Sequence, residues 1–173
     1  MAELPSLRDD AFWDTSTQEP LVPAHAGGKQ RKEREYKERV ETRGRARALQ
    51  ALYAADMRDF TQLKRIASQV FDDLSIVPDE RKFASQLIAT VADHGAEIDA
   101  ALADVTVNWR FERLGAIERS VLRVAAAEFR RETVPVKVVL KEAVRLAERF
   151  GSERSAQFVN GVLDAYARRL GRL

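Results

Sequence analysis

Residues 134–170 constrain the fold of this chain more than any other stretch. Pro135 suits a first helical position, because its φ is already helical and it lacks the N–H that would go unsatisfied there. Behind it, apolar residues recur at steps of three and four, which gathers them on one side of an α-helix that needs a partner surface. These residues are Val136, Val139, Leu140, Ala143, Val144, Ala147 and Phe150.

A second helix restarts after a short corner. We expect Gly151 to take a left-handed cap conformation and Ser152 to accept from the free N–H groups of the next turn. The same apolar spacing then returns, which predicts an αα-hairpin. Gly161 is interpreted as a small residue where another helix comes close. The second stripe consists of Phe158, Val159, Val162, Leu163, Tyr166 and Leu170.

A strand is the alternative for residues 134–140, which are rich in β-branched side chains. The apolar spacing continues for about 16 residues, whereas strands usually end within about 8, so a helix is favoured. Similar periodicity predicts helices over 61–74, with Thr61 as N-cap, and over 116–131. Residues 29–57 are helix-prone because Glu and Lys or Arg are mixed at i, i+4, and their first half, which has almost no apolar stripe, is expected to be a solvated or frayed helix. Another helix is expected from Pro78, with either a bend or a tight helix crossing at His94-Gly95, and a short one within 105–114. Without a confident strand, the chain is predicted to be all-α.

Composition narrows the class of protein. The 173 residues are 45% hydrophobic and 32% charged, which is typical of one globular domain. There is no cysteine, no apolar run long enough for a membrane span, and no secretory signal in the first residues, so a cytoplasmic protein is expected. No phosphate-binding glycine loop, nucleophile–base pair or metal-ligand spacing is found, so we predict neither catalysis nor a cofactor nor a metal site.

Charge is distributed unevenly along the chain. Residues 1–28 carry five acidic residues and one arginine, whereas residues 29–47 carry nine basic and four acidic residues. We expect 1–28 to be a disordered acidic tail, 29–41 a basic helical extension and 42–173 the folded domain. Mixed charges in the extension suggest pairs at i, i+4, namely Glu33 with Lys37, Glu35 with Arg39 and Glu41 with Arg45.

Two groups of residues could bind nucleic acid. Arg43, Arg47 and Gln50 fall at i, i+4 and i+7 on one helix, so they form either an RNA-binding face or an ordinary solvated one. Arg110 and Arg113 alternate with aromatic residues, as in single-stranded RNA sites. Trp109 among them is interpreted as a core residue.

Several segments resemble the NusB family of bacterial transcription antitermination proteins over residues 42–166. They are RGRARALQALY, LGAIERSVLRVAAAE, VPVKVVLKEAVRLAERF and FGSERSAQFVNGVLD. The resemblance implies two small helical bundles of about seven helices in one domain. It also implies binding to boxA RNA of nascent ribosomal transcripts, with the ribosomal small-subunit protein NusE, within the RNA polymerase antitermination complex. Self-association, known for some members, is left open.

The resemblance nominates residues for each partner. Those matching RNA-binding positions are Arg43, Arg45, Arg47, Gln50 and Tyr53, with Arg110 and Arg113 as further candidates; the candidates for partner binding are Phe150, Glu153, Arg154 and Phe158. Lys141 and Arg154 depart from the common family pattern. Charge reversal at Arg45 and Arg47 is predicted to weaken RNA binding without lowering the melting temperature.

Two hypotheses remain beside this one. The chain could be a helical protein-interaction module whose basic helix contacts an acidic protein, in which case it shows neither tight RNA binding nor sequence preference. The acidic tail could also cover the basic helix, so that deleting it raises RNA affinity.

Overall fold

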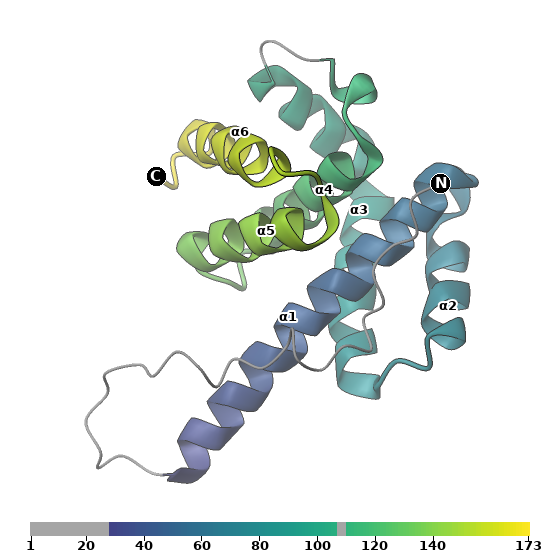
Figure 1. The fold of residues 1–173 in the computed structure, drawn as a ribbon, viewed down its shortest axis with the longest axis vertical. Helices are drawn as coiled ribbons and strands as arrows, with labels where there is room; N and C mark the ends of the chain where they lie inside the picture. Colours follow the sequence, from purple (N-terminus) through teal and green to yellow (C-terminus); the bar gives the residue numbers. More distant parts are fainter. Residues whose placement is uncertain (1–27, 107–109) are drawn as a thin grey trace.

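The structure, a computed structural model, describes residues 28–106 and 110–173, and all the regular secondary structure in these residues is helical (Figure 1). Residues 1–27 and Trp109, with the expectations attached to them, lie outside the described part. The prediction of an all-α fold is confirmed, with six α-helices in the described residues instead of about seven. They are α1 (Gly28–Met57), α2 (Leu63–Asp73), α3 (Pro78–Val105), α4 (Ala116–Arg131), α5 (Val136–Phe150) and α6 (Ser155–Arg169), with 3₁₀ turns η2 (Phe60–Gln62) and η3 (Phe111–Arg113).

The helices form two small bundles, as the family resemblance implied. α1 packs against α2 and α3, and α5 packs against α6. α4 contacts α5 and α6 and also reaches α1 and α3, so it joins the two bundles. Figure 1 shows α5 and α6 on one side of this central helix and α2 on the far side of α1 and α3.

α4 owes its central place to its sequence. Every residue from Ser120 to Phe129 is buried, including the alanine run at 125–127, whose small side chains let neighbouring helices come close. The helix ends at Arg131 and is capped by Glu132, which has a left-handed φ of 55° and donates its N–H to the Glu128 carbonyl.

α3 begins and bends where the sequence predicted. Pro78 occupies the first turn, followed by Asp79 and Glu80 at the positive end of the helix dipole. His94 has non-helical dihedral angles, with φ −129° and ψ 18°, and so divides α3 into two segments. The predicted N-cap at Thr61 is wrong. α2 begins at Leu63, after Gln62, which makes no side-chain cap hydrogen bond, and Thr61 lies in η2, whose cap is Asp59: its side chain accepts from the Thr61 N–H.

The corner between α5 and α6 differs from the predicted one. Gly151 is extended, with φ −95° and ψ −166°, so it is not a left-handed cap. Ser155 caps the corner in place of Ser152, because its Oγ accepts from the Ser152 N–H at 2.7 Å. Glycine is required here by space: a Cβ would lie 2.5 Å from Ser155 Oγ and 2.7 Å from the Ala147 carbonyl oxygen.

The close helix crossing expected at Gly161 occurs elsewhere. A Cβ on Gly161 would meet nothing within 4 Å, and the residue is exposed. A Cβ on Gly44 would instead lie 2.7 Å from the Phe83 ring, so Gly44 is where α1 and α3 approach closely.

Candidate nucleic-acid interface

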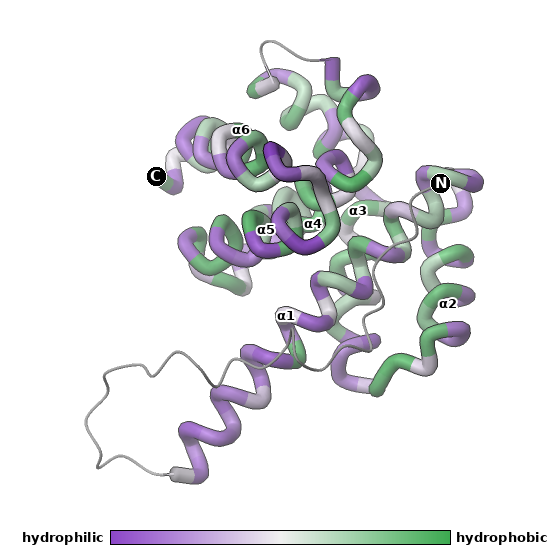
Figure 2. Tube along the Cα trace, viewed as in Figure 1, coloured by the Kyte–Doolittle hydropathy of each residue, from purple (hydrophilic) through white to green (hydrophobic). Residues whose placement is uncertain are grey.

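α1 consists of two parts with different surroundings. Residues 28–39 are all exposed, and burial begins within residues 40–44 and continues through the second half of the helix. Figure 2 shows the first part as a hydrophilic rod that projects from the body. We refer to residues 28–41 as the N-terminal extension.

Arg45 lies inside the protein and not on its surface. Its side chain is 2% exposed, and its Nε and Nη2 donate to both carboxylate oxygens of Glu128 at 2.6–3.0 Å. Glu142 lies 3.8 Å away, and the guanidinium stands 5.2 Å from the centre of the Phe83 ring. The inclusion of Arg45 among surface RNA contacts is therefore corrected: it is a buried structural residue.

The charges of this pair influence each other. Burial acts to lower the pKa of Arg45, but the hydrogen bonds and charge of Glu128 outweigh it and the pKa is raised. Burial raises the pKa of Glu128, and Arg45 opposes that shift. Because two oxygens of one carboxylate accept from the guanidinium, we assign the pair as ionised at neutral pH.

Arg43 and Arg47 lie on the surface next to the start of α3. Their side chains are 28% and 16% exposed, and each forms an ion pair with Glu80, at 3.5 Å and 3.4 Å. Glu80 itself is buried. One carboxylate is therefore shared by two arginines.

Gln50 and Tyr53 continue along α1 toward the core. Gln50 is buried, and its Oε1 has no hydrogen-bond partner in the described part of the chain. Tyr53 is half-buried.

Arg110 and Arg113 are exposed, but they lie at a separate position. Arg110 directly precedes η3, and Arg113 is its last residue. Arg119 connects this turn to α1, because its guanidinium donates to the carbonyl oxygens of Glu112 and Leu114 and pairs with Asp56 near the end of α1. Asp56 is nine residues beyond Arg47, which corresponds to about 13 Å along the helix. An RNA segment would have to span this distance to contact both groups of arginines.

Sequence reasoning missed an ionic network that connects three helices. Asp56 of α1 pairs with both Arg119 and Arg123 of α4, and Arg123 also pairs with Asp99 of α3 at 2.7 Å. The Arg123 guanidinium stands 4.3 Å from the centre of the Phe60 ring. The only signal in the sequence was the i, i+4 spacing of Arg119 and Arg123 beside an apolar stripe. Charged residues on any solvated helix have the same spacing.

The four partner-binding candidates at the α5–α6 corner differ in accessibility. Phe150 is 8% exposed and belongs to the core, which corrects its assignment as a surface contact. Glu153 and Arg154 are exposed, and Phe158 is half-buried. Ser155 fixes the corner on α4, because its hydroxyl donates to Glu118.

The described residues contain no group of three or more potential metal ligands. None of the helices in that part of the chain is long and apolar enough to cross a membrane.

The fold and this surface define a class of all-α proteins with two three-helix bundles and a cationic first helix. Within that class, the chain belongs to the NusB family, whose family model matches residues 42–168. The transcription antitermination protein NusB of Anaeromyxobacter dehalogenans (strain 2CP-1 / ATCC BAA-258) is 43% identical over 135 residues, covering 73% of this chain and 89% of that protein.

Solved structures agree with this assignment. The structure of T. maritima NusB matches with a TM-score of 0.69 and 29% identity, covering 74% of this chain and 90% of that one. A crystal structure of the antitermination factors NusB and NusE in complex with dsRNA matches with a TM-score of 0.68 and 29% identity, covering 76% and 98%. The N-terminal extension precedes the residues that the family model matches.

Proposed function

We propose that this protein is a transcription antitermination factor that binds boxA RNA of nascent transcripts together with NusE, as part of the RNA polymerase antitermination complex. Support comes from relatives that are transcription antitermination proteins and from the likeness to a NusB–NusE complex with dsRNA. We propose further that the role is one of binding without catalysis, in the cytoplasm.

The observation that carries the proposal is the position of Arg43 and Arg47. Both side chains are partly exposed, and both are oriented by the same carboxylate of Glu80. Guanidinium groups suit phosphates because they offer several donors in a planar fork. The RNA would therefore approach α1 on the side that faces the start of α3.

The partner protein would bind at the α5–α6 corner. Glu153 and Arg154 are exposed there, and the ring of Phe158 is half-buried beside them, which combines apolar area with both signs of charge. Arg154 carries a positive charge where the family often has an acidic residue, so the affinity for the partner would differ from that of family members with the acidic residue.

The test is a binding titration with boxA RNA and a scrambled RNA, each with and without NusE, at several salt concentrations. We expect tighter binding to boxA than to the scrambled RNA, a further gain with NusE, and loss of affinity with rising salt. Equal and weak binding to both RNAs, with and without NusE, would contradict the proposal and favour a module that contacts an acidic protein.

A further inference from the structure

We propose that the N-terminal extension is an additional phosphate-binding surface, which holds RNA that flanks boxA. This inference rests on the proposed function, because it assigns the flank of the same RNA. It concerns residues that precede those matched by the family model.

The first observation is a line of cationic side chains along α1. An α-helix turns by about 100° per residue, so side chains spaced by 3, 4 or 7 residues share a face. Five cations of α1 fall within an arc of about 80° around its axis by this rule. This cationic stripe consists of Lys29, Lys32, Arg39, Arg43 and Arg47.

The second observation is that three of the four acids of the extension pair with its other cations. The pairs are Arg31 with Glu35 at 2.7 Å, Arg34 with Glu38 at 2.8 Å, and Lys37 with Glu41 at 3.8 Å. Of the pairs predicted from the sequence, Glu41 with Arg45 is present at 3.8 Å. The other two are absent from the described residues.

This pairing leaves the stripe charged. Lys29, Lys32 and Arg39 are exposed and form no ion pair with any residue in ranges 28–106 and 110–173. Exposed lysine and arginine side chains without a carboxylate partner are free to replace the counterions of a polyanion, which is the main source of affinity for phosphates.

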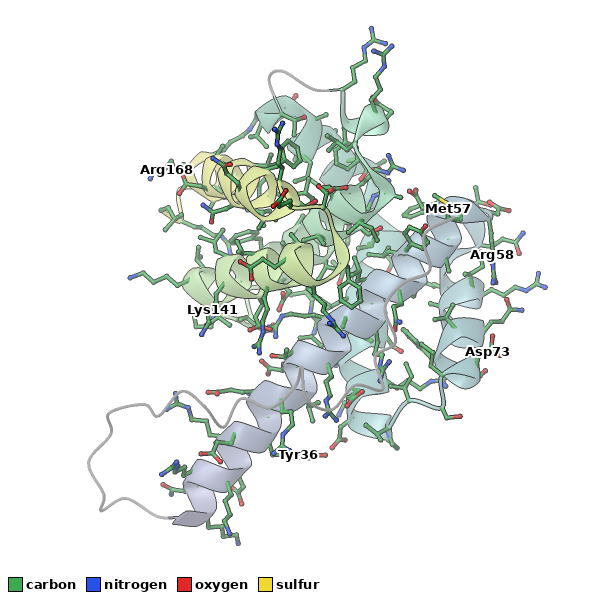
Figure 3. All side chains as sticks on the ribbon, viewed as in Figure 1. Tyr36, Met57, Arg58, Asp73, Lys141 and Arg168 are labelled. Carbon is green, nitrogen blue, oxygen red and sulfur yellow. The ribbon has the colours of Figure 1, made fainter. Side chains whose placement is uncertain are left out.

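The third observation is that the extension is held at a fixed position relative to Arg43 and Arg47. It continues into the packed half of α1 without interruption, and the Tyr36 hydroxyl donates to Asp79 of α3 at 2.7 Å. Tyr36 lies on the same arc as the cationic stripe; Figure 3 labels it on the projecting half of α1. The stripe therefore continues the proposed RNA surface in a straight line.

The composition of the extension fits RNA better than a protein. Its only large apolar side chains are Tyr36 and Val40, so it offers no apolar face to a partner helix. From Lys29 to Arg43 the stripe is about 21 Å long, enough for several nucleotides. The occupant we infer is the sugar–phosphate backbone of single-stranded RNA next to boxA, bound without regard to sequence.

The experiment compares two RNAs and two matched triple variants of the full chain. One RNA is boxA alone, and the other carries about ten extra nucleotides on each side, longer than the span of the stripe. The first variant is Lys29→Gln/Lys32→Gln/Arg39→Gln, which removes the stripe cations. The control is Arg31→Gln/Arg34→Gln/Lys37→Gln, which removes the same number of charges from the same helix outside the stripe. Circular dichroism checks that both variants keep their helix content.

We expect the stripe variant to bind the long RNA at least about tenfold more weakly than the unaltered protein, with boxA alone affected much less. For the long RNA, the slope of the logarithm of the binding constant against the logarithm of the salt concentration should also become shallower by about two, at roughly 0.7 per lost phosphate contact. The control should change less in both measurements.

Equal effects of the two variants on the long RNA would overturn the inference, since charge alone would then explain them. So would a stripe variant that binds the long RNA normally, the result expected if the stripe contacts an acidic protein segment. In both cases boxA binding by the unaltered protein would still support the proposed function. Failure of that protein to bind either RNA would refute the proposed function itself.

Discussion

Arg45 and Glu128, which are 83 residues apart in the sequence, form a buried ion pair that joins α1 to α4. Two carboxylate oxygens accept from one guanidinium, and both side chains are 2% exposed. The pair lies directly behind Arg43 and Arg47 on α1, so it supports the helix that presents them.

Replacing Arg45 by methionine should destabilise the protein by about 3–5 kcal/mol, because Glu128 would be left buried without its partner. The double variant Arg45→Met/Glu128→Leu should recover much of that loss, since neither charge is then buried. Urea unfolding followed by circular dichroism measures both. A single variant as stable as the unaltered protein would contradict the assignment of Arg45 as structural.

This expectation replaces the sequence-based prediction for charge reversal at Arg45. Reversal there would place a second carboxylate next to Glu128 in the interior, and the melting temperature would fall. Loss of RNA binding by such a variant would not identify a contact.

Neutralising Arg43 or Arg47 should weaken RNA binding with little effect on stability. The single variants Arg43→Gln and Arg47→Gln each leave Glu80 with the other arginine, so no buried carboxylate loses all its partners. Each should lower affinity severalfold at moderate salt. Fluorescence anisotropy with boxA RNA is the measurement, and Arg65→Gln, an exposed arginine of α2, is the control. Unchanged affinity in both variants would rule out this side of α1 as the RNA surface.

Substitution of Gly151 by alanine should destabilise the α5–α6 corner by about 1–3 kcal/mol. The added Cβ would lie 2.5 Å from Ser155 Oγ and 2.7 Å from a backbone oxygen, and the backbone atom cannot move aside cheaply. The thermal midpoint should fall, and binding of the partner protein at the corner should weaken with it. A midpoint equal to that of the unaltered protein would show that the corner has room for the methyl group.

Gly161→Ala is the matched substitution and should have the opposite effect. The position is inside α6, and a Cβ there would meet nothing within 4 Å. Alanine stabilises an exposed helix position by about 0.5–1 kcal/mol relative to glycine, so the thermal midpoint should rise. A fall would mean that an unrecognised contact requires glycine.

Asp56→Asn should loosen the junction between the two bundles, because Asp56 is shared by Arg119 and Arg123. Arg123 retains Asp99, so we expect a partial loss of about 1–3 kcal/mol. Asp73→Asn is the control: Figure 3 labels this exposed residue on α2, and it forms no ion pair within the described residues. Equal stability of the two variants in urea unfolding would show that the network contributes nothing measurable.

The helices of this protein could be predicted because their signals are local. Pro78 marks the start of α3, the apolar spacing from Ala116 to Arg131 gives the bounds of α4, and His94 marks the bend in α3. In each case the relevant residues lie within one or two turns of one another, and the 3.6-residue period is visible in the sequence. The two-bundle arrangement followed from the family resemblance.

The candidate site was only partly predictable, because the sequence reports which side chains share a helix face and not what that face meets. Arg43, Arg45 and Arg47 look alike on the printed sequence, yet Arg45 alone is enclosed between α1 and α4. The close helix crossing expected at Gly161 is likewise found at Gly44.

By itself the sequence determined the helices, their inward faces and the excess of positive charge near the start of α1. Only the tertiary structure decided which of those charges remain exposed, because an ion pair depends on distance through space. Glu128 reaches Arg45 from another helix, and no local pattern of residues records that approach.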